Sequence, residues 1–399
     1  MRRVYVAGVA ETKREMCPRK DVRTLVFEAT SAAVADAGLE IRDIQQMWVA
    51  RSPATCDQQF ALGQVIVDVL GLSGRAACVT VEEGCTASGM SFHDAYLAVA
   101  SGMYDIVLSA GVTKAGDSLD LFNGYSELGY NPFDSQLGVM LGYADFDGYA
   151  RKYGVTDDDI YAWYETECWY ATRNPLCPMY KRKYLSLEEW RKLPYRAYPL
   201  RYGSGIEFAD GAAAAILVSE KIAKKLTDTR IFVAGISQKE ESSYYPHTLS
   251  YGLYQSPDMQ PPVEFAMMHS ISNRVAWKEA LCMAGIAPKD LDLVQPHQGA
   301  VWLVYNSLDC LGHPDIPFGG GPKWYSEGNA KPGGKLPSGT SAIAKGGYNS
   351  GGDALQYVYE TVKQLRENAG ERQCPMKSYA GAWMVGASLR PVAAVIRRE

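Results

Sequence analysis

The chain has 399 residues, of which 47% are hydrophobic and 21% are charged, and its formal net charge is −5. This length predicts at least two core units in a large globular protein. The acidic balance and the lack of a long basic stripe argue against nucleic acid as a partner, and no apolar run is long enough to cross a bilayer.

The nine cysteines are odd in number and scattered, and none forms a Cys-x-x-Cys pair. This pattern argues against a disulfide framework and against a zinc site, so we expect a reducing, cytoplasmic compartment. The basic start of the chain is followed by a short apolar run, residues 4–10, which Glu11 and Lys13 interrupt too early for a signal peptide. We interpret that run as a first strand.

Two stretches of the chain recur in the same order. Residues 3–9 (RVYVAGV) match residues 230–236 (RIFVAGI), and residues 34–39 (VADAGL) match residues 281–286 (LCMAGI). Each half is therefore expected to begin with a strand, a helix, an Ala-Gly cap and a second strand, in a sheet covered by helices on both sides. We place the halves at residues 1–227 and 228–399.

Within the first half, Cys85 follows a β-rich stretch and precedes a helical pattern at residues 90–101. The sequence thus predicts a thiol at or just before a helix N-terminus, where unpaired N–H groups and the macrodipole favour a thiolate. A buried structural cysteine is the alternative for such a position taken alone.

A segment of different character, residues 116–205, separates two predicted buried strands at residues 105–111 and 210–218. It is rich in tyrosine and tryptophan and carries many basic residues, among them Lys181, Arg182 and Lys183. Long insertions of this kind often form lids or ligand-binding surfaces, although a solvated helical face explains any single charge equally well.

In the second half, His297 comes just past a predicted buried strand. A histidine there is often structural, but one suitable cysteine with a distant histidine is the sequence signature of a thiol nucleophile. We expect His297 to hold an oxyanion or to share a proton with Cys85.

The Cys85-Thr-Ala-Ser-Gly run after a strand, the Asp210-Gly-Ala-Ala-Ala run before one, the insertion, the repeated half and the Gly-rich C-terminal stretch together resemble the thiolase superfamily, in its lipid-transfer (sterol-carrier-type) branch. The resemblance implies an α/β protein of two similar halves in a five-layered α/β/α/β/α fold with an inserted loop domain. It also implies a homodimer that joins a small OB-fold, zinc-ribbon subunit in a heterotetramer. That partner would carry the zinc, and no metal is expected in this chain.

The chain departs from the thiolase pattern at two places. Thiolases usually carry a Gly-His-Pro whose histidine activates the nucleophile, whereas the comparable glycine-rich region here has Tyr348 after Gly347. The later Cys-x-Gly of thiolases falls near Tyr379, which becomes the second candidate. A tyrosine can serve as an acid or a hydrogen-bond donor. Ser338 and Gly339, together with the basic run at residues 181–183, are the expected contacts for coenzyme A.

The resemblance implies CoA-dependent cleavage of a 3-oxoacyl-CoA through an acyl group on Cys85. The overall pattern is similar to the thiolases of anaerobic toluene degradation, which implies an aromatic substrate such as benzoylsuccinyl-CoA, cleaved to benzoyl-CoA and succinyl-CoA. One alternative is retro-aldol cleavage of a β-hydroxyacyl-CoA, as in the steroid side-chain lyases of this branch, which have Gly-Tyr in place of Gly-His. Another is a non-catalytic, acyl-CoA-binding scaffold subunit.

Overall fold

The computed structural model describes residues 2–17, 19–51, 59–117, 145–226, 230–240, 265, 268–386 and 390–399. All structural statements refer to these ranges. None of the helices within them is long and apolar enough to span a membrane.

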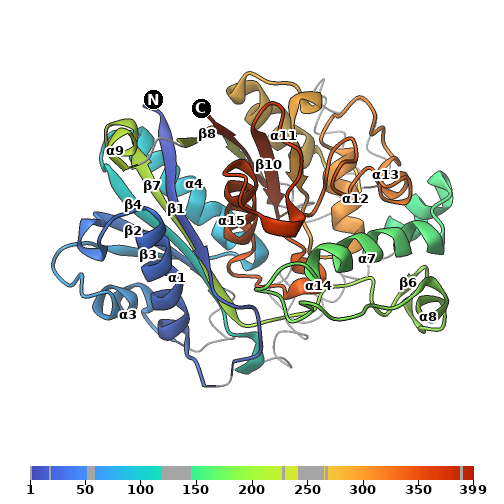
Figure 1. Ribbon diagram of the computed structural model, residues 1–399, viewed down its shortest axis with the longest axis horizontal. Helices are drawn as coiled ribbons and strands as arrows, with labels where there is room; N and C mark the ends of the chain where they lie inside the picture. The colour runs from blue at the N-terminus through green and yellow to red at the C-terminus, as the bar shows by residue number, and fades with distance from the viewer. Residues whose placement is uncertain are drawn as a thin grey trace.

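A nine-stranded sheet forms the frame of the molecule, in the order β3-β2-β4-β7-β1-β8-β11-β10-β9 (Figure 1). Its strands are β1 (Val4–Glu11), β2 (Gln46–Arg51), β3 (Cys78–Glu82), β4 (Ile106–Thr113), β7 (Gly211–Ser219), β8 (Ile231–Gln238), β9 (Leu293–Gln295), β10 (Ala380–Val385) and β11 (Val392–Arg398). β7 runs antiparallel to β1 and β4, and β11 runs antiparallel to β8 and β10. β2 is parallel to β4, as β9 is to β10.

The strand order therefore repeats itself outward from the centre, where Tyr5 of β1 pairs with Phe232 of β8. From the centre outward, the first half has the order β1, β7, β4, β2, and the second half has the order β8, β11, β10, β9. In both halves the first strand of the sequence thus lies beside the last, which lies beside the preceding strand of this sheet, and the second strand comes next. The proposed boundary between the halves lies at residues 227–228, in a stretch outside the described residues.

The repeated glycines of the sequence have one physical role. A Cβ atom on Gly8 of β1 would lie 2.1 Å from the carbonyl oxygen of Ala33, and one on Gly235 of β8 would lie 2.0 Å from that of Ala280. Those carbonyls belong to α1 (Val22–Asp36) and α11 (Ile271–Ala284). Glycine thus lets the outer helix of each half pack directly on its first strand.

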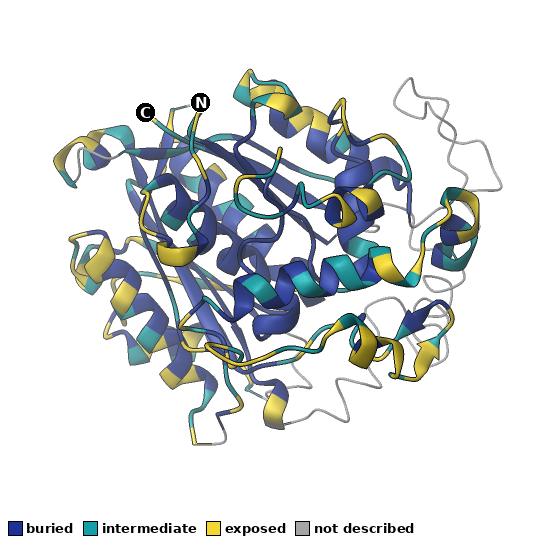
Figure 2. Cartoon of the chain, turned by 45° about the vertical axis from the view of Figure 1, so that its right-hand side comes forward, coloured by how far each residue is buried: buried dark blue, intermediate teal, exposed yellow. Residues whose placement is uncertain are grey.

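Helices lie outside and between the two halves of the sheet. α1 and α3 (Leu62–Val69) pack on the outer face of the first half, and α11 packs on that of the second. Between the halves, α4 (Ala87–Ala100) and α15 (Asp353–Leu365) contact each other and strands of both halves. Figure 2 shows buried residues concentrated in this centre and exposed residues on the outer helices and loops.

α9 (Glu220–Leu226) packs on β1 and β7. The remaining elements lie on the other side of the frame (Figure 1), and they are α7 (Asp157–Ala171), α8 (Leu187–Arg191), β5 (Tyr195–Ala197), β6 (Leu200–Arg201), α12 (Val301–Asp309), α13 (Gly321–Ser326) and α14 (Ile343–Gly346). α7 is the main helix of the insertion, and it packs on α13 and α14 (Figure 1). It begins with a capping box between Thr156 and Asp159.

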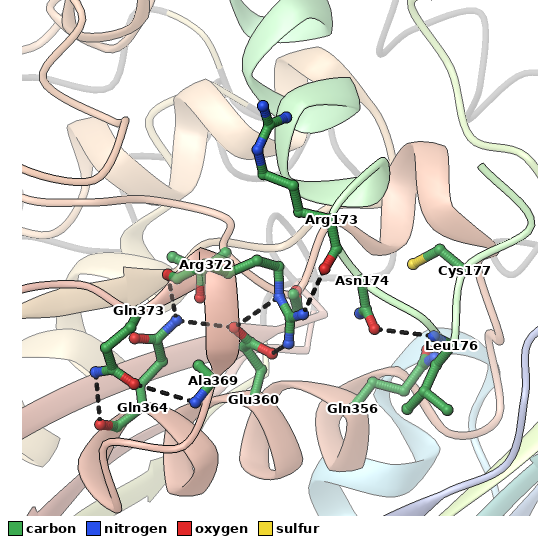
Figure 3. Close-up of polar contacts among 12 residues, drawn as sticks. Arg173, Asn174, Leu176, Cys177, Gln356, Glu360, Gln364, Ala369, Arg372 and Gln373 are labelled. Atoms are coloured by element: carbon green, nitrogen blue, oxygen red, sulfur yellow. Dashed lines mark hydrogen bonds and ion pairs between the residues drawn. The ribbon is translucent and has the colours of Figure 1, made fainter. Parts of the chain in front are cut away.

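A buried ion pair attaches the insertion to the core. Arg372 donates to the carboxylate of Glu360 on α15 over 2.7 Å and to the backbone carbonyl of Arg173, just past α7, over 3.2 Å (Figure 3). Both side chains of the pair are almost fully buried. Removing either partner of this ion pair would leave an uncompensated buried charge. Because Arg372 binds both α15 and the backbone just past α7, it holds the end of α7 next to α15.

Candidate active site

Cys85 lies where the sequence predicts it, in a short helical turn, Gly84–Thr86, that leads directly into α4. Gly84 adopts a φ of +55°, a conformation that favours glycine and turns the chain from β3 into the helix. The thiol is buried, with 8% of the residue exposed. The start of α4 gives this thiol a partial positive charge to face.

His297 lies two residues beyond β9, and its backbone N–H donates to the Ser307 hydroxyl over 3.1 Å. Its ring Nε2 lies 3.3 Å from the hydroxyl of Tyr348, the residue predicted in place of the usual histidine. Burial lowers the pKa of His297 to about 3, so the ring is neutral at any working pH.

Asp353, which we did not predict from the sequence, completes the cluster. Its carboxylate accepts from the Tyr348 hydroxyl over 2.8 Å, from the backbone N–H of Ala354 over 2.8 Å and from the Ser88 hydroxyl over 3.2 Å. A sulphur of Cys85, a ring nitrogen of His297 and a carboxylate oxygen of Asp353 all lie within 4.8 Å of one another. The signal that could have found it is its position directly after the Gly351-Gly352 pair, at the start of a helix.

The hydrogen bonds assign the histidine tautomer. Tyr348 has one hydroxyl proton and gives it to Asp353, so the neutral ring of His297 meets the tyrosine oxygen as a donor, through Nε2–H. The cluster thus holds a thiol, an N–H donor, a phenol and a carboxylate. Two helix N-termini, those of α4 and α15, converge on it and favour negative charge there.

The cluster also contains the kinds of donor that zinc accepts, a sulphur, an imidazole and a carboxylate. Among the described residues it is the one such group. Its carboxylate and imidazole are already engaged with the Tyr348 hydroxyl, which is an arrangement for moving protons.

The structure does not bring Tyr379 to this cluster. Tyr379 precedes β10, whereas His297 follows β9, and the two strands are parallel, with Gly381 opposite Leu293. Tyr379 and His297 therefore lie at opposite ends of these two neighbouring strands, about 20 Å apart along the strand direction at 3.3 Å per residue. Arg398 covers the Tyr379 ring. At the end of β10 that faces α4, the residue is Val385, which lies against Gly89.

The residues expected to contact coenzyme A fall in two places. Ser338 and Gly339 are behind the cluster, beside β9, where the Ser338 hydroxyl donates to the carbonyl of Leu336 and the Gly339 N–H donates to that of Val294. The basic run at residues 181–183 is exposed on the surface of the insertion. Ser338 and Gly339 are thus buried, whereas the basic run faces solvent.

The described aromatic residues of the insertion are divided between the core and the surface, where Tyr180, Tyr195, Tyr198 and Tyr202 are exposed. The rings of Tyr164 and Trp190 have their centroids 4.7 Å apart, and Trp163 and Trp190 are fully buried. The tyrosine pair at residues 244–245 lies outside the described residues.

Comparisons with known proteins agree with this architecture. The family model described as Thiolase C-terminal domain-like matches residues 264–397. The chain is 28% identical to an acetyl-CoA acetyltransferase of Methanothermobacter thermautotrophicus, over 94% of this chain and 93% of the relative. It is 27% identical to the benzoylsuccinyl-CoA thiolase subunit BbsB of Thauera aromatica, over 94% of this chain and 90% of the relative. These matches support a place for the chain in the thiolase superfamily.

The thiolase fold predicted from the sequence is confirmed. The solved structure of the Ltp2–ChsH2(DUF35) aldolase superposes with a TM-score of 0.79 at 19% identity, over 99% of this chain and 97% of that chain. In this chain Cys85 and the histidine after β9 lie together, with Tyr348 and Asp353 beside them.

Proposed function

We propose that the chain catalyses CoA-dependent cleavage of a 3-oxoacyl-CoA through an acyl thioester on Cys85. One observation carries this proposal: Cys85, His297 and Asp353 bring a sulphur, a nitrogen and a carboxylate oxygen within 4.8 Å of one another at the start of two helices. Such a site suits an activated thiol nucleophile with a base beside it.

In the first half-reaction the thiol proton of Cys85 passes to the Asp353 carboxylate, and the sulphur attacks the β-keto carbon. The N–H of His297, which turns from the Tyr348 oxygen to the substrate, and the backbone N–H groups at the start of α4 hold the resulting oxyanion. The bond between the α- and β-carbons then breaks, and the sulphur keeps the acyl group. The departing acyl-CoA enolate takes the proton back from Asp353, directly or through the Tyr348 hydroxyl.

In the second half-reaction free coenzyme A gives its thiol proton to Asp353 and attacks the thioester on Cys85. The sulphur of Cys85 leaves and takes up that proton, so the protein returns to its first state. Coenzyme A is therefore a co-substrate, and the basic run at residues 181–183 is the proposed contact for its phosphates, because those side chains are exposed.

The proposed substrate is an aromatic 3-oxoacyl-CoA of the benzoylsuccinyl-CoA type. Support comes from the relative whose name contains that compound. We further propose a homodimer that works with a small OB-fold, zinc-ribbon subunit. The names of two similar proteins point the same way, since one is a subunit and the other joins two components. We also propose a reducing, cytoplasmic compartment, and the eight described cysteines, none of which forms a disulfide, are compatible with it.

The test is mass spectrometry of the chain after incubation with acetoacetyl-CoA or benzoylsuccinyl-CoA. We expect an acyl adduct on Cys85 that free coenzyme A removes, and loss of both adduct and turnover in Cys85→Ala. The matched control is Cys282→Ala, because Cys282 is exposed on α11, outside the cluster. Turnover that survives Cys85→Ala, or a wild-type chain without any adduct, would refute the covalent route.

Retro-aldol cleavage remains the second candidate, and the Tyr348–Asp353 hydrogen bond favours it. A phenol held by a carboxylate could take the proton of a β-hydroxyl group, with no need for the thiol. This reaction would convert a β-hydroxyacyl-CoA without added coenzyme A and would persist in Cys85→Ala. Absence of turnover with either substrate class would favour the scaffold subunit.

A further inference from the structure

A second buried polar group lies behind the cluster, where α7 of the insertion meets the His297 loop. Glu167 on α7 is fully buried, and neither of its carboxyl oxygens has a hydrogen-bond partner among the described residues. The side-chain nitrogen of Gln298, the residue next to His297, is likewise buried without a partner there. Unpartnered buried polar groups are costly, so their presence at one place calls for a role.

Gly339 brings these two groups together. A Cβ atom on Gly339 would lie 2.6 Å from the Gln298 Nε2 and 2.6 Å from the Glu167 Oε1. The two atoms are therefore no more than twice that distance apart, a gap that one water molecule or a small side-chain rotation closes. Gly339 also has a φ of +74°, so a larger residue would be both strained and in collision.

The orientation of the Gln298 amide is determined by its other contacts. Its Oε1 accepts from the backbone N–H of Ile343 over 2.8 Å and from the Ser341 hydroxyl over 3.0 Å. Because Oε1 faces those donors, Nε2 must point toward Gly339 and Glu167. Gln298 thus connects the loop of His297 to the start of α14, the helix that precedes Tyr348.

We propose that Glu167 is a positioning residue: it accepts from the Gln298 amide, directly or through one water, and thereby holds the loops of His297 and Tyr348 in register. The inserted helix α7 then has a function in catalysis beyond covering the core. This inference rests on the proposed function, because it assigns Glu167 to the same cluster of Cys85, His297 and Asp353.

The electrostatic environment agrees with this role. Burial raises the pKa of Glu167 well above its usual range, while Lys345 of α14 and Arg14 lower it. Tyr325 of α13 and Tyr357 of α15 also face this carboxyl. A neutral acid can accept from the Gln298 amide with one oxygen without placing an unpaired charge in the core.

The test compares Glu167→Leu, which removes the acceptor, with Glu167→Gln, which keeps one. We expect Glu167→Leu to lower kcat for acetoacetyl-CoA thiolysis at least tenfold, with the KM for coenzyme A changed less than twofold, and Glu167→Gln to recover kcat to within about threefold. The matched control is Glu165→Leu on the same helix, whose partly exposed carboxylate pairs with Lys331 and should leave kcat unchanged.

A double-mutant cycle separates positioning from general stability. If Glu167 acts through Gln298, then Glu167→Leu combined with Gln298→Leu should be no slower than the slower single variant. Additive losses, or equal losses in Glu167→Gln and Glu167→Leu, would overturn the proposal. Should the leucine variant fail to fold, Glu167→Ala, which leaves room for water, takes its place.

The rate at which iodoacetamide alkylates Cys85 is measured on every variant, because this reaction requires no turnover. Glu167→Leu should change that rate, and its pH profile, at least threefold, while Glu167→Gln should not. If the wild-type chain forms no acyl adduct, the proposed function fails, but the alkylation rates still decide the role of Glu167. Alkylation and kcat that both match the wild type would refute the positioning role.

Discussion

Asp353 begins α15, Cys85 lies in the turn that enters α4, and the Ser88 hydroxyl joins the two helices by donating to the Asp353 carboxylate over 3.2 Å. The two helices occupy matching places in the repeat. In the first half α4 precedes β4, which pairs with the last strand, β7, and in the second half α15 precedes β10, which pairs with the last strand, β11. Duplication has thus placed two helix N-termini face to face, and one carries the thiol while the other carries the carboxylate.

Asp353→Asn tests the carboxylate as the proton acceptor. The amide keeps the size and can still accept from Tyr348, but it cannot take the thiol proton, so kcat should fall about 10²- to 10⁴-fold. The measurement is the rate of acyl transfer to Cys85 in a single turnover. The control is the exposed Asp315→Asn; a single-turnover rate within threefold of wild type in Asp353→Asn would exclude Asp353 as the base.

Tyr348→Phe tests the hydroxyl between His297 and Asp353. Its loss removes the donor to Asp353 and the acceptor of the His297 N–H, and we expect kcat to fall about 10²-fold while the chain remains folded. Tyr170→Phe is the matched control, because the buried Tyr170 hydroxyl donates to the backbone carbonyl of Ala330 over 2.9 Å, outside the cluster. The comparison is made by steady-state kinetics, and equal rates in the two variants would contradict a proton role for Tyr348.

Asp309→Asn tests a pH dependence of stability. Burial raises the pKa of Asp309 from 3.8 to about 7, although hydrogen bonds from Tyr149 and from the N–H groups of Gly319 and Gly321 lower it. Between these values the folded chain keeps the proton and the unfolded chain does not, so this group makes stability fall as pH rises, by about 1.4 kcal/mol per pH unit. Urea unfolding from pH 4.5 to 7 should show a less negative slope in Asp309→Asn; parallel curves would contradict this assignment.

Gly89→Ala tests the packing of α4 on the end of β10. The added Cβ would lie 2.5 Å from a methyl group of Val385 and 3.1 Å from the Cβ of Val392. These β-branched neighbours cannot rotate away, so we expect a loss of about 1–3 kcal/mol in the free energy of unfolding. Adding Val385→Ala should restore part of that loss, as measured by denaturant unfolding of both variants. An unchanged stability in Gly89→Ala would show that α4 can shift.

Part of this site could be predicted from the sequence because it depends on local order along the chain. A strand followed by Cys85 and a helix, and a strand followed by His297, are one-dimensional patterns, and their repetition predicts the shared frame. The glycine-rich motif likewise predicts Tyr348, because the tyrosine stands where the motif usually has histidine. Its place beside His297 agrees with that interpretation.

The other members could not be predicted in this way. Asp353 looks like any acidic residue in the first turn of a helix, where an acid is common, and only the docking of α15 on α4 gives it a partner. The spacing along the chain predicts Tyr379, but spacing does not show which end of a strand the residue occupies. Glu167 lies on a helix full of aromatic residues, and nothing in the sequence pairs it with Gln298.

The docking of α4 against α15 has a consequence for how the protein acquires activity. Ser88 and Asp353, which join the two helices, are separated by 265 positions in the chain, and the histidine comes from a third region. Closing loops of this length is slow, and each half can form its own hydrogen bonds before they close. During refolding we therefore expect secondary structure to return first and thiol reactivity to reach its native value last, once both halves have met.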